Sequence, residues 1–301
     1  LIDGEMKPCF EMPSRADFIL ERVRETKLGD VIAPASFGLD PVHRVHDKGF
    51  IAFLGSAWDE WSALGRKHDA LPLIWPVRGM RQDRVPEDID GKLGYYSMDA
   101  GVPITAGTWA AVSDAVNVAL TGARHVREGA RGAFSLCRPP GHHAAADYMG
   151  GYCYINNAAV AAQSFLDAGA KRVAILDVDY HHGNGTQSIF YQRSDVLFAS
   201  LHGDPRTEYP FFLGHADEPA RVPASATTPT FRCNRVRLGR TIWWRSTRPA
   251  PVSPITRRTH WWCLSVSILS KKTRFRNSSC AARTICVSAR RSDDWGNRPC
   301  S

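Results

Sequence analysis

The alternation of apolar and polar positions predicts helices and strands that follow one another through the first 218 residues. Apolar side chains recur at helical spacing from Trp109 to Val126 and from Ala158 to Leu166. Short apolar runs, typical of buried strands, occupy residues 30–33, 133–136, 173–176 and 196–200. Further helices are expected near residues 187–191 and after a capping box formed by Ser14 and Asp17.

Strands that alternate with helices indicate an α/β fold with three layers, in which a mainly parallel sheet carries helices on both faces. Functional residues of such sheets gather at the carboxyl ends of the strands. Residues 71–107 have little periodicity and many Pro and Gly residues, which predicts a functional or partner-binding loop. We expect neither a signal peptide nor a membrane span.

Charge and composition divide the chain near residue 219. Residues 221–301 hold 17 of the 38 Lys and Arg but 2 of the 30 Asp and Glu, a net charge of +15. The first 220 residues therefore carry a net charge of −7. The tail also holds five of the eight cysteines and shows no helical or strand period. The other three cysteines lack disulfide or CxxC spacing, which favours a reducing cytoplasm.

Two polar motifs follow predicted strands. Arg138–His143 (RPPGHH) places two adjacent histidines on a Pro-Gly turn, and Asp177–Gly185 (DVDYHHGNG) begins with polar residues at alternate positions. Because residues two apart in an extended segment share a face, Asp177, Asp179 and His181 point the same way. Either motif alone is more often a solvated turn or a helix cap. Their common position at strand ends of one sheet favours a functional site.

The residue types of the two motifs predict metal-assisted hydrolysis. Carboxylate and imidazole groups are ligands of catalytic Zn²⁺, and Fe²⁺ or Co²⁺ would accept them as well. The metal would lower the pKa of a bound water and polarise a carbonyl. His142 or His143 would then accept the water proton and later protonate a leaving amine. Asp177 would orient one imidazole through its other ring nitrogen.

Both motifs and Gly150–Ala158 (GGYCYINNA) resemble the zinc-dependent deacetylase superfamily of arginases and histone deacetylases. Within it the chain is similar to the bacterial acetylpolyamine amidohydrolases, which are close to class II histone deacetylases. The resemblance covers about residues 1–218 and implies an incomplete deacetylase domain of arginase/deacetylase-like fold, truncated at both ends. It implies hydrolysis of N-acetylated polyamines, with protein acetyl-lysine as the alternative substrate.

The resemblance also implies catalytic roles and metal sites. His143 would be the general base and acid, bonded to Asn184, and His142 its electrostatic partner, bonded to Asp177. The implied zinc ligands are Asp179 and His181, and the implied ligands of a structural potassium ion are Asp177 and Ser200.

Three further residues are implied as substrate contacts. Tyr152 and Tyr209 would form the aromatic walls of a tunnel for the acylated amine, and Asp90 would face a small cationic substrate. The long loop that contains Asp90 would also help to form a homodimer. Ordinary packing or a solvated loop is the competing interpretation of these three residues.

Two motifs of the family do not occur after residue 218. They are the third zinc ligand, an aspartate in Gly-Val-Asp-Thr-Phe, and an oxyanion-binding tyrosine in Gly-Gly-Tyr. The codons of His260–Cys263, CAyTGGTGGTGy, give Leu-Val-Val when read from the third nucleotide. In that frame the codons of Leu264–Arg276 permit Ser-Leu-Gly-Val-Asp-Thr-Phe-Glu-Lys-Asp-Pro-Ile-Ser, whose first aspartate codon spans Ser267 and Ile268.

We therefore interpret residues 219–301 as an out-of-frame translation without an evolved fold, which follows a frame slip between about residues 218 and 227. The chain as written would be inactive or weakly active, whereas its in-frame parent would be an active enzyme. The competing interpretation is a non-enzymatic protein whose basic, Trp-bearing tail binds nucleic acid. The displaced frame explains the excess of Arg, Trp and Cys better.

Overall fold

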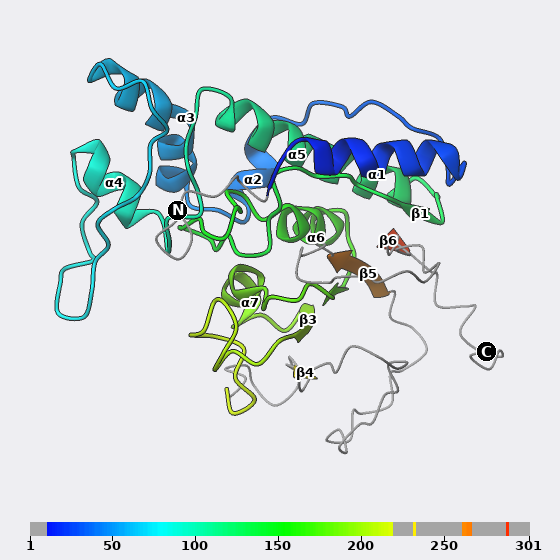
Figure 1. Ribbon diagram of the computed structural model, residues 1–301. Coiled ribbons are helices and arrows are strands. Elements are labelled where there is room, and N and C mark those ends of the chain that lie inside the picture. The colour runs from blue at the N-terminus through cyan, green and yellow to red at the C-terminus, as the bar shows by residue number, and fades with distance from the viewer. Residues whose placement is uncertain (1–10, 219–230, 233–260, 267–286, 289–301) are drawn as a thin grey trace, which may run out of the picture.

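The computed structural model describes residues 11–218 and three strands of the tail, at residues 231–232, 261–266 and 287–288 (Figure 1). The helices are α1 (Ser14–Glu25), α2 (Asp40–His43), α3 (Lys48–Ala63), α4 (Ile89–Tyr95), α5 (Thr108–Arg127), α6 (Asn157–Asp167) and α7 (Asn184–Phe190). The strands are β1 (Gly132–Ala133), β2 (Arg172–Asp177), β3 (Val196–His202), β4 (Phe231–Arg232), β5 (Trp261–Val266) and β6 (Val287–Ser288).

A parallel sheet with the order β4-β3-β2-β5 positions the functional residues. In the pairing of β2 with β3, Val173 lies opposite Val196 and Asp177 lies opposite Ser200. On the other edge of β2, the parallel strand β5 places Val266 opposite Asp177. Parallel pairing therefore brings Asp177 and Ser200 to the same, carboxyl end of the sheet.

One hydrophobic core lies between this sheet and the helices α5 and α6. Alternate side chains of β2 and β3 are buried, among them Ile175 and Phe198, and they pack with Phe165 of α6 and Phe190 of α7. Each such side chain contributes about 1.5–3 kcal/mol of transfer free energy. The intervening residues of the same strands, such as Leu197, are half-buried. This alternation fixes the register of the strands and hence the place of the residues that follow them.

A second core joins α3 and α4 to Val112, Val116 and Leu120 of α5. The carboxylate of Asp47 accepts a hydrogen bond from Phe50 N (3.0 Å) and so defines the start of α3. The sequence analysis predicted neither α3 nor α4. For α3 the signal exists, since buried side chains recur at helical spacing from Phe50 to Trp61.

Three local predictions were wrong. Residues 30–33 form no strand, and Val31 is exposed, because the next residues bond to α5 instead: Ala35 N donates to Thr121 Oγ1. Helix α1 begins at Ser14 as predicted, but no side chain caps it and none of its residues is buried. The strand expected at residues 133–136 is reduced to β1, which pairs antiparallel with β6 outside the parallel sheet.

Two observations concern the environment of the chain. Cys137 and Cys153 are free thiols. Within the described ranges, no helix combines the length and the apolar character needed to cross a bilayer.

Candidate active site

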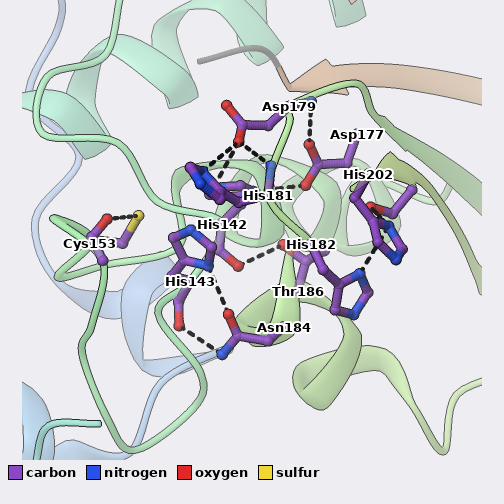
Figure 2. A network of polar contacts seen from close by, with 12 residues as sticks. His142, His143, Cys153, Asp177, Asp179, His181, His182, Asn184, Thr186 and His202 are labelled. Carbon is purple, nitrogen blue, oxygen red and sulfur yellow. Dashed lines mark hydrogen bonds and ion pairs between the residues drawn. The ribbon is translucent and has the colours of Figure 1, made fainter. Parts of the chain in front are cut away.

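Side chains from both motifs converge beyond the carboxyl ends of β2 and β3 (Figure 2). His142 and His143 come from the loop before α6, Asp177 ends β2, and Asn184 begins α7. Asp177 Oδ2 lies 2.9 Å from His142 Nδ1, and Asn184 Oδ1 lies 2.7 Å from His143 Nδ1. The structure thus places each histidine beside the partner expected for it.

The site is dry and tightly packed around the pair of His142 and Asp177, which are 1% and 0% exposed. A Cβ atom on Gly183 would lie 2.3 Å from Asp177 Oδ2 and 3.3 Å from His142 Nδ1. Only glycine therefore allows the backbone to approach this hydrogen bond so closely. Exclusion of water strengthens the electrostatic interactions that remain.

The two histidines differ in their protonation. Burial alone would lower the pKa of His142, but the charge of Asp177 and its hydrogen bond raise the pKa above the ordinary value. For His143, burial and the charge of His142 hold the pKa well below the ordinary value. With Nδ1–H donating to Asn184, neutral His143 keeps the lone pair on Nε2. One histidine is therefore the charged partner and the other a free base.

Asp179 and His181 form a half-site for a metal ion, with one carboxylate and one imidazole. His181 N donates to Asp179 Oδ1 (2.7 Å), and His181 Nδ1 lies 3.4 Å from the same oxygen. Asp179 Oδ2 is buried without a hydrogen-bond partner. Burial would raise the pKa of Asp179, but the hydrogen bonds from His181 and the charge of His142 lower it, so the carboxylate is ionised.

An ionised, unpaired carboxylate oxygen beside an imidazole fits a divalent cation such as zinc. Within the part of the chain that the structure describes, however, no group of three His, Cys, Asp or Glu side chains could hold a metal ion. Asp179 and His181 are thus two candidate ligands among the described residues.

Several residues without a predicted role stabilise the loops of the site. Asn156 Nδ2 donates to Ala144 O and to Thr186 Oγ1, both at 3.0 Å. Thr186 N donates to His142 O (3.1 Å), and His46 Nε2 accepts from Asn156 N (3.0 Å). Asn156 and Thr186 lie within or directly after segments that the sequence singled out, whereas no sequence signal pointed to His46 or to the pairing of these three residues.

Ser200, the predicted potassium ligand, is fully buried and lies beside a histidine pair. Its Oγ is 2.9 Å from His202 Nδ1, and His182 Nδ1 is 3.3 Å from the same nitrogen. His202 Nε2 contacts Gly214 O at 3.1 Å. The alternation of β3, which puts Ser200 and His202 on one face, was the signal that could have found His202.

The two predicted tunnel tyrosines lie on segments that reach the histidines. The ring of Tyr209 stands edge-on to His143 at 4.9 Å and to His181 at 5.7 Å. Tyr152 follows Gly151 in a turn with left-handed backbone, at φ values of 67° and 52° respectively. A Cβ atom on Gly151 would lie 2.4 Å from His143 Cδ2, so this turn packs against the imidazole.

Asp90, the predicted contact of a cationic substrate, lies in the first turn of α4, and its carboxylate forms two hydrogen bonds with Arg66, at 2.7 and 2.8 Å. Arg66 is itself stacked on the ring of Trp61 at 4.1 Å. Within this chain the negative charge of Asp90 is therefore compensated by Arg66, and its role towards a substrate stays a prediction.

Comparison with known proteins places these residues in a family context. The family model of the histone deacetylase domain matches residues 9–236. Acetylpolyamine amidohydrolase 2 of Pseudomonas aeruginosa is 66% identical over 218 residues, which cover 72% of this chain and 63% of that protein. The acetylpolyamine amidohydrolase of Mycoplana ramosa is 52% identical over 235 residues, or 78% of this chain and 69% of that protein.

The fold is likewise similar to that of a solved structure. The crystal structure of acetylpolyamine aminohydrolase from Burkholderia pseudomallei, at 37% identity, matches with a TM-score of 0.70 over 78% of this chain and 67% of that chain. This similarity confirms the predicted arginase/deacetylase-like α/β fold. The chain spans 63% of the length of the Pseudomonas relative named above.

Proposed function

This chain belongs to the histone deacetylase family, and we propose that its site hydrolyses the acetamide bond of N-acetylated polyamines. The observation that carries the proposal is the division of labour between two adjacent histidines. His143 is a neutral base bonded to an amide, whereas His142 is bonded to the carboxylate of Asp177 (2.9 Å). Amide hydrolysis needs such a group, which takes a proton and later returns it.

The residues of the chain suffice to define the proton path. Nε2 of His143 accepts a proton from a water whose oxygen bonds to the acetyl carbon. The same nitrogen then gives the proton to the amide nitrogen, the C–N bond breaks, and acetate and a free amine are released. Asn184 fixes the tautomer of His143, because its Oδ1 accepts from Nδ1–H (2.7 Å). The hydrogen-bonded pair of His142 and Asp177 stays beside the reacting groups during both proton transfers.

A divalent metal, with zinc as the first candidate and Fe²⁺ or Co²⁺ as alternatives, would be held by Asp179 and His181. When bound, the ion would polarise the acetyl carbonyl and acidify the water. Two observations support this metal site: Asp179 Oδ2 is buried without a hydrogen-bond partner, and the His181 imidazole lies beside the same carboxylate. A structural potassium ion at Asp177 and Ser200 is a further proposal, supported by their opposite positions on β2 and β3.

Polyamine derivatives are proposed as substrates because the relatives reported above are acetylpolyamine amidohydrolases. Tyr209 beside His143, with Tyr152 on the turn that packs against the same ring, would line the path of a slender aliphatic amine. Acetyl-lysine in a protein is the second candidate, since its side chain presents the same acetamide on an aliphatic chain.

The tail remains proposed to be an out-of-frame translation that follows an incomplete domain at residues 1–218. In the chain as given, Val266 of β5 pairs with Asp177 at the end of β2. If a strand translated in the displaced frame kept this register, its aspartate would lie one to two residues beyond the position of Val266. Asp179 lies at the corresponding distance beyond Asp177, so the restored aspartate would reach the half-site as a third ligand.

A homodimer of the in-frame parent is also proposed. Within residues 71–85, which precede α4, six apolar side chains are exposed by 40% or more: Leu71, Leu73, Ile74, Val77, Met80 and Val85. Such a concentration in one segment is typical of a surface that meets a partner. A location in the cytoplasm is proposed because Cys137 and Cys153 are free thiols.

Resequencing of the coding DNA and parallel assays would test the function. The 301-residue chain and a version with the frame restored after residue 218 would be loaded with Zn²⁺ and given N⁸-acetylspermidine, N-acetylputrescine and an acetyl-lysine peptide. We expect acetate release from the acetylated amines by the restored protein and little or none by the present chain. Preference for the peptide would favour protein deacetylation. Salt-dependent binding of nucleic acid, lost on removal of residues 220–301, would favour the non-enzymatic alternative.

A further inference from the structure

The carboxylate of Asp99 connects three separate segments of the chain. Within its own loop, Oδ1 accepts a hydrogen bond from Gly101 N (2.7 Å). Oδ2 accepts from Gly151 N (3.1 Å), in the turn that precedes Tyr152. The hydroxyl of Tyr209 donates to the same Oδ2 in a short contact. One side chain thus bonds to both segments that carry the tunnel tyrosines.

The bond to Gly151 holds a turn that needs external support. Gly151 and Tyr152 are consecutive left-handed residues, with φ values of 52° and 67°. A residue with a Cβ atom adopts this conformation only where its surroundings impose it. Tyr152 N donates to Gly101 O (3.1 Å), and Gly101 N is bonded to Asp99. Gly150 and Cys153 close the turn by two backbone hydrogen bonds of their own, at 3.0 and 2.8 Å. The bonds from Gly151 N and Tyr152 N tie the closed turn to the loop that Asp99 organises.

The bond to Tyr209 fixes a ring that touches two functional side chains. The ring centroid of Tyr209 is 4.9 Å from that of His143 and 5.7 Å from that of His181, edge-on in both cases. Burial raises the pKa of Tyr209, and the charge of Asp99 and the hydrogen bond to it add to the effect. The hydroxyl therefore keeps its proton and donates it in the hydrogen bond to Asp99.

We infer that Asp99 is a positioning residue, which sets the places of Tyr152 and Tyr209 along the substrate path; this inference rests on the function proposed above. The carboxylate acts through the two tyrosines, because its hydrogen bonds go to Gly101, Gly151 and Tyr209. Its loss would release both aromatic side chains together. Binding of the acylated amine would weaken, while proton transfer at His143 would keep its rate.

The variants separate the bonds of Asp99 from one another. Asp99→Asn keeps the shape and one acceptor oxygen but removes the charge, whereas Asp99→Ala removes every bond. Tyr209→Phe removes the hydroxyl bond and leaves the Gly151 bond intact. Asp83→Ala is the matched control, since Asp83 is exposed and bonds to Arg81 on the surface.

Hydrogen exchange followed by mass spectrometry on the 301-residue chain tests the positioning directly. We expect Asp99→Ala to speed exchange about tenfold in both segments 150–153 and 207–211. Asp99→Asn should have a smaller effect in both, Tyr209→Phe should affect 207–211 alone, and Asp83→Ala neither. Unchanged protection of α6 shows that a variant is folded. An effect of Asp99→Asn confined to residues 97–103 would overturn the inference.

The second measurement is binding of N-acetylputrescine to the same chain with Zn²⁺, followed by calorimetry. We expect Asp99→Asn to weaken binding about fivefold to tenfold, and any measurable turnover to show a raised KM with kcat changed less than twofold. A fall in kcat at constant KM would contradict a positioning role. If the unaltered chain does not bind the probe, the same titration is made with the frame-restored protein, where absence of binding would count against the proposed function. The exchange experiment decides the role of Asp99 in either case.

Discussion

Nδ1 of His143 lies 2.7 Å from the side-chain oxygen of Asn184, a neutral amide, whereas the adjacent His142 faces the carboxylate of Asp177. The two imidazoles are only 3.9 Å apart between ring centroids. Two histidines so close do not both hold a proton at low cost, so the different partners decide which one is charged. The carboxylate retains the proton on His142 and leaves His143 as the base.

Replacement of the amide by a carboxylate should therefore alter the base. In Asn184→Asp, a negative charge beside His143 would raise its pKa. Since the base must be neutral, the acidic limb of the rate profile of the restored protein would shift to higher pH by the same amount. NMR titration of the histidine rings in the 301-residue chain gives the pKa without turnover. An unchanged His143 pKa would contradict the assignment.

Removal of the carboxylate from the other histidine should reduce stability in a pH-dependent manner. The pKa of His142 is raised in the folded state, so its contribution to stability is full below the unfolded pKa and is lost as pH rises through the folded pKa. We expect Asp177→Asn to lower the free energy of unfolding by about 3–5 kcal/mol at pH 6 and by less at pH 9. Urea unfolding at both pH values measures this, and an equal loss at both would contradict it.

Buried neutral histidines should make the fold sensitive to acid. Burial lowers the pKa of His46 to about 4 and that of His182 to about 3. Because these side chains gain a proton more readily when unfolded, stability falls as pH drops from about 6.5 towards the folded values. His46→Gln, which keeps an acceptor for Asn156 N, should remove about 3 kcal/mol of that acid sensitivity between pH 7 and 4. Unfolding by urea across this range provides the measurement.

The sequence was enough to predict the fold class and to bring together residues that are close along the chain. Asp177, Asp179 and His181 are such residues, although β2 ends at Asp177 and strand period does not extend to the other two. Asp99 could not be found in this way, because its partners Gly151 and Tyr209 are joined to it only by the tertiary fold. Local sequence patterns carry no information on such contacts.

Asp90 illustrates a second limit of sequence reasoning. An acidic residue in a polar loop is equally compatible with a substrate contact and with an internal ion pair. Arg66, 24 positions earlier in the chain, forms the ion pair, and only the folded chain shows that the two side chains meet. The strand predicted at residues 30–33 failed for the same reason, since tertiary contacts with α5 replace strand pairing.

The close backbone approach at Gly183 can be tested with two alanine variants. A Cβ at this position would lie 2.3 Å from Asp177 Oδ2, so Gly183→Ala must displace the carboxylate or the loop. We expect a loss of about 2–4 kcal/mol in stability from overpacking and loss of the His142 bond. Gly29→Ala is the control, since nothing lies within 4 Å of a Cβ there. Equal effects of the two variants on thermal unfolding would refute the packing argument.

Metal binding distinguishes the half-site from a complete one. With the ligands Asp179 and His181 alone, the 301-residue chain should bind Zn²⁺ weakly, whereas a restored third carboxylate should raise the affinity by a factor of 100 or more. His181→Ala should abolish the weak binding, whereas replacement of the exposed His68 should leave it unchanged. Equilibrium dialysis with Zn²⁺ and the absorption spectrum of bound Co²⁺ measure affinity and ligand number without turnover. Equal zinc affinity of the two proteins would show that the frame of the tail does not determine the metal site.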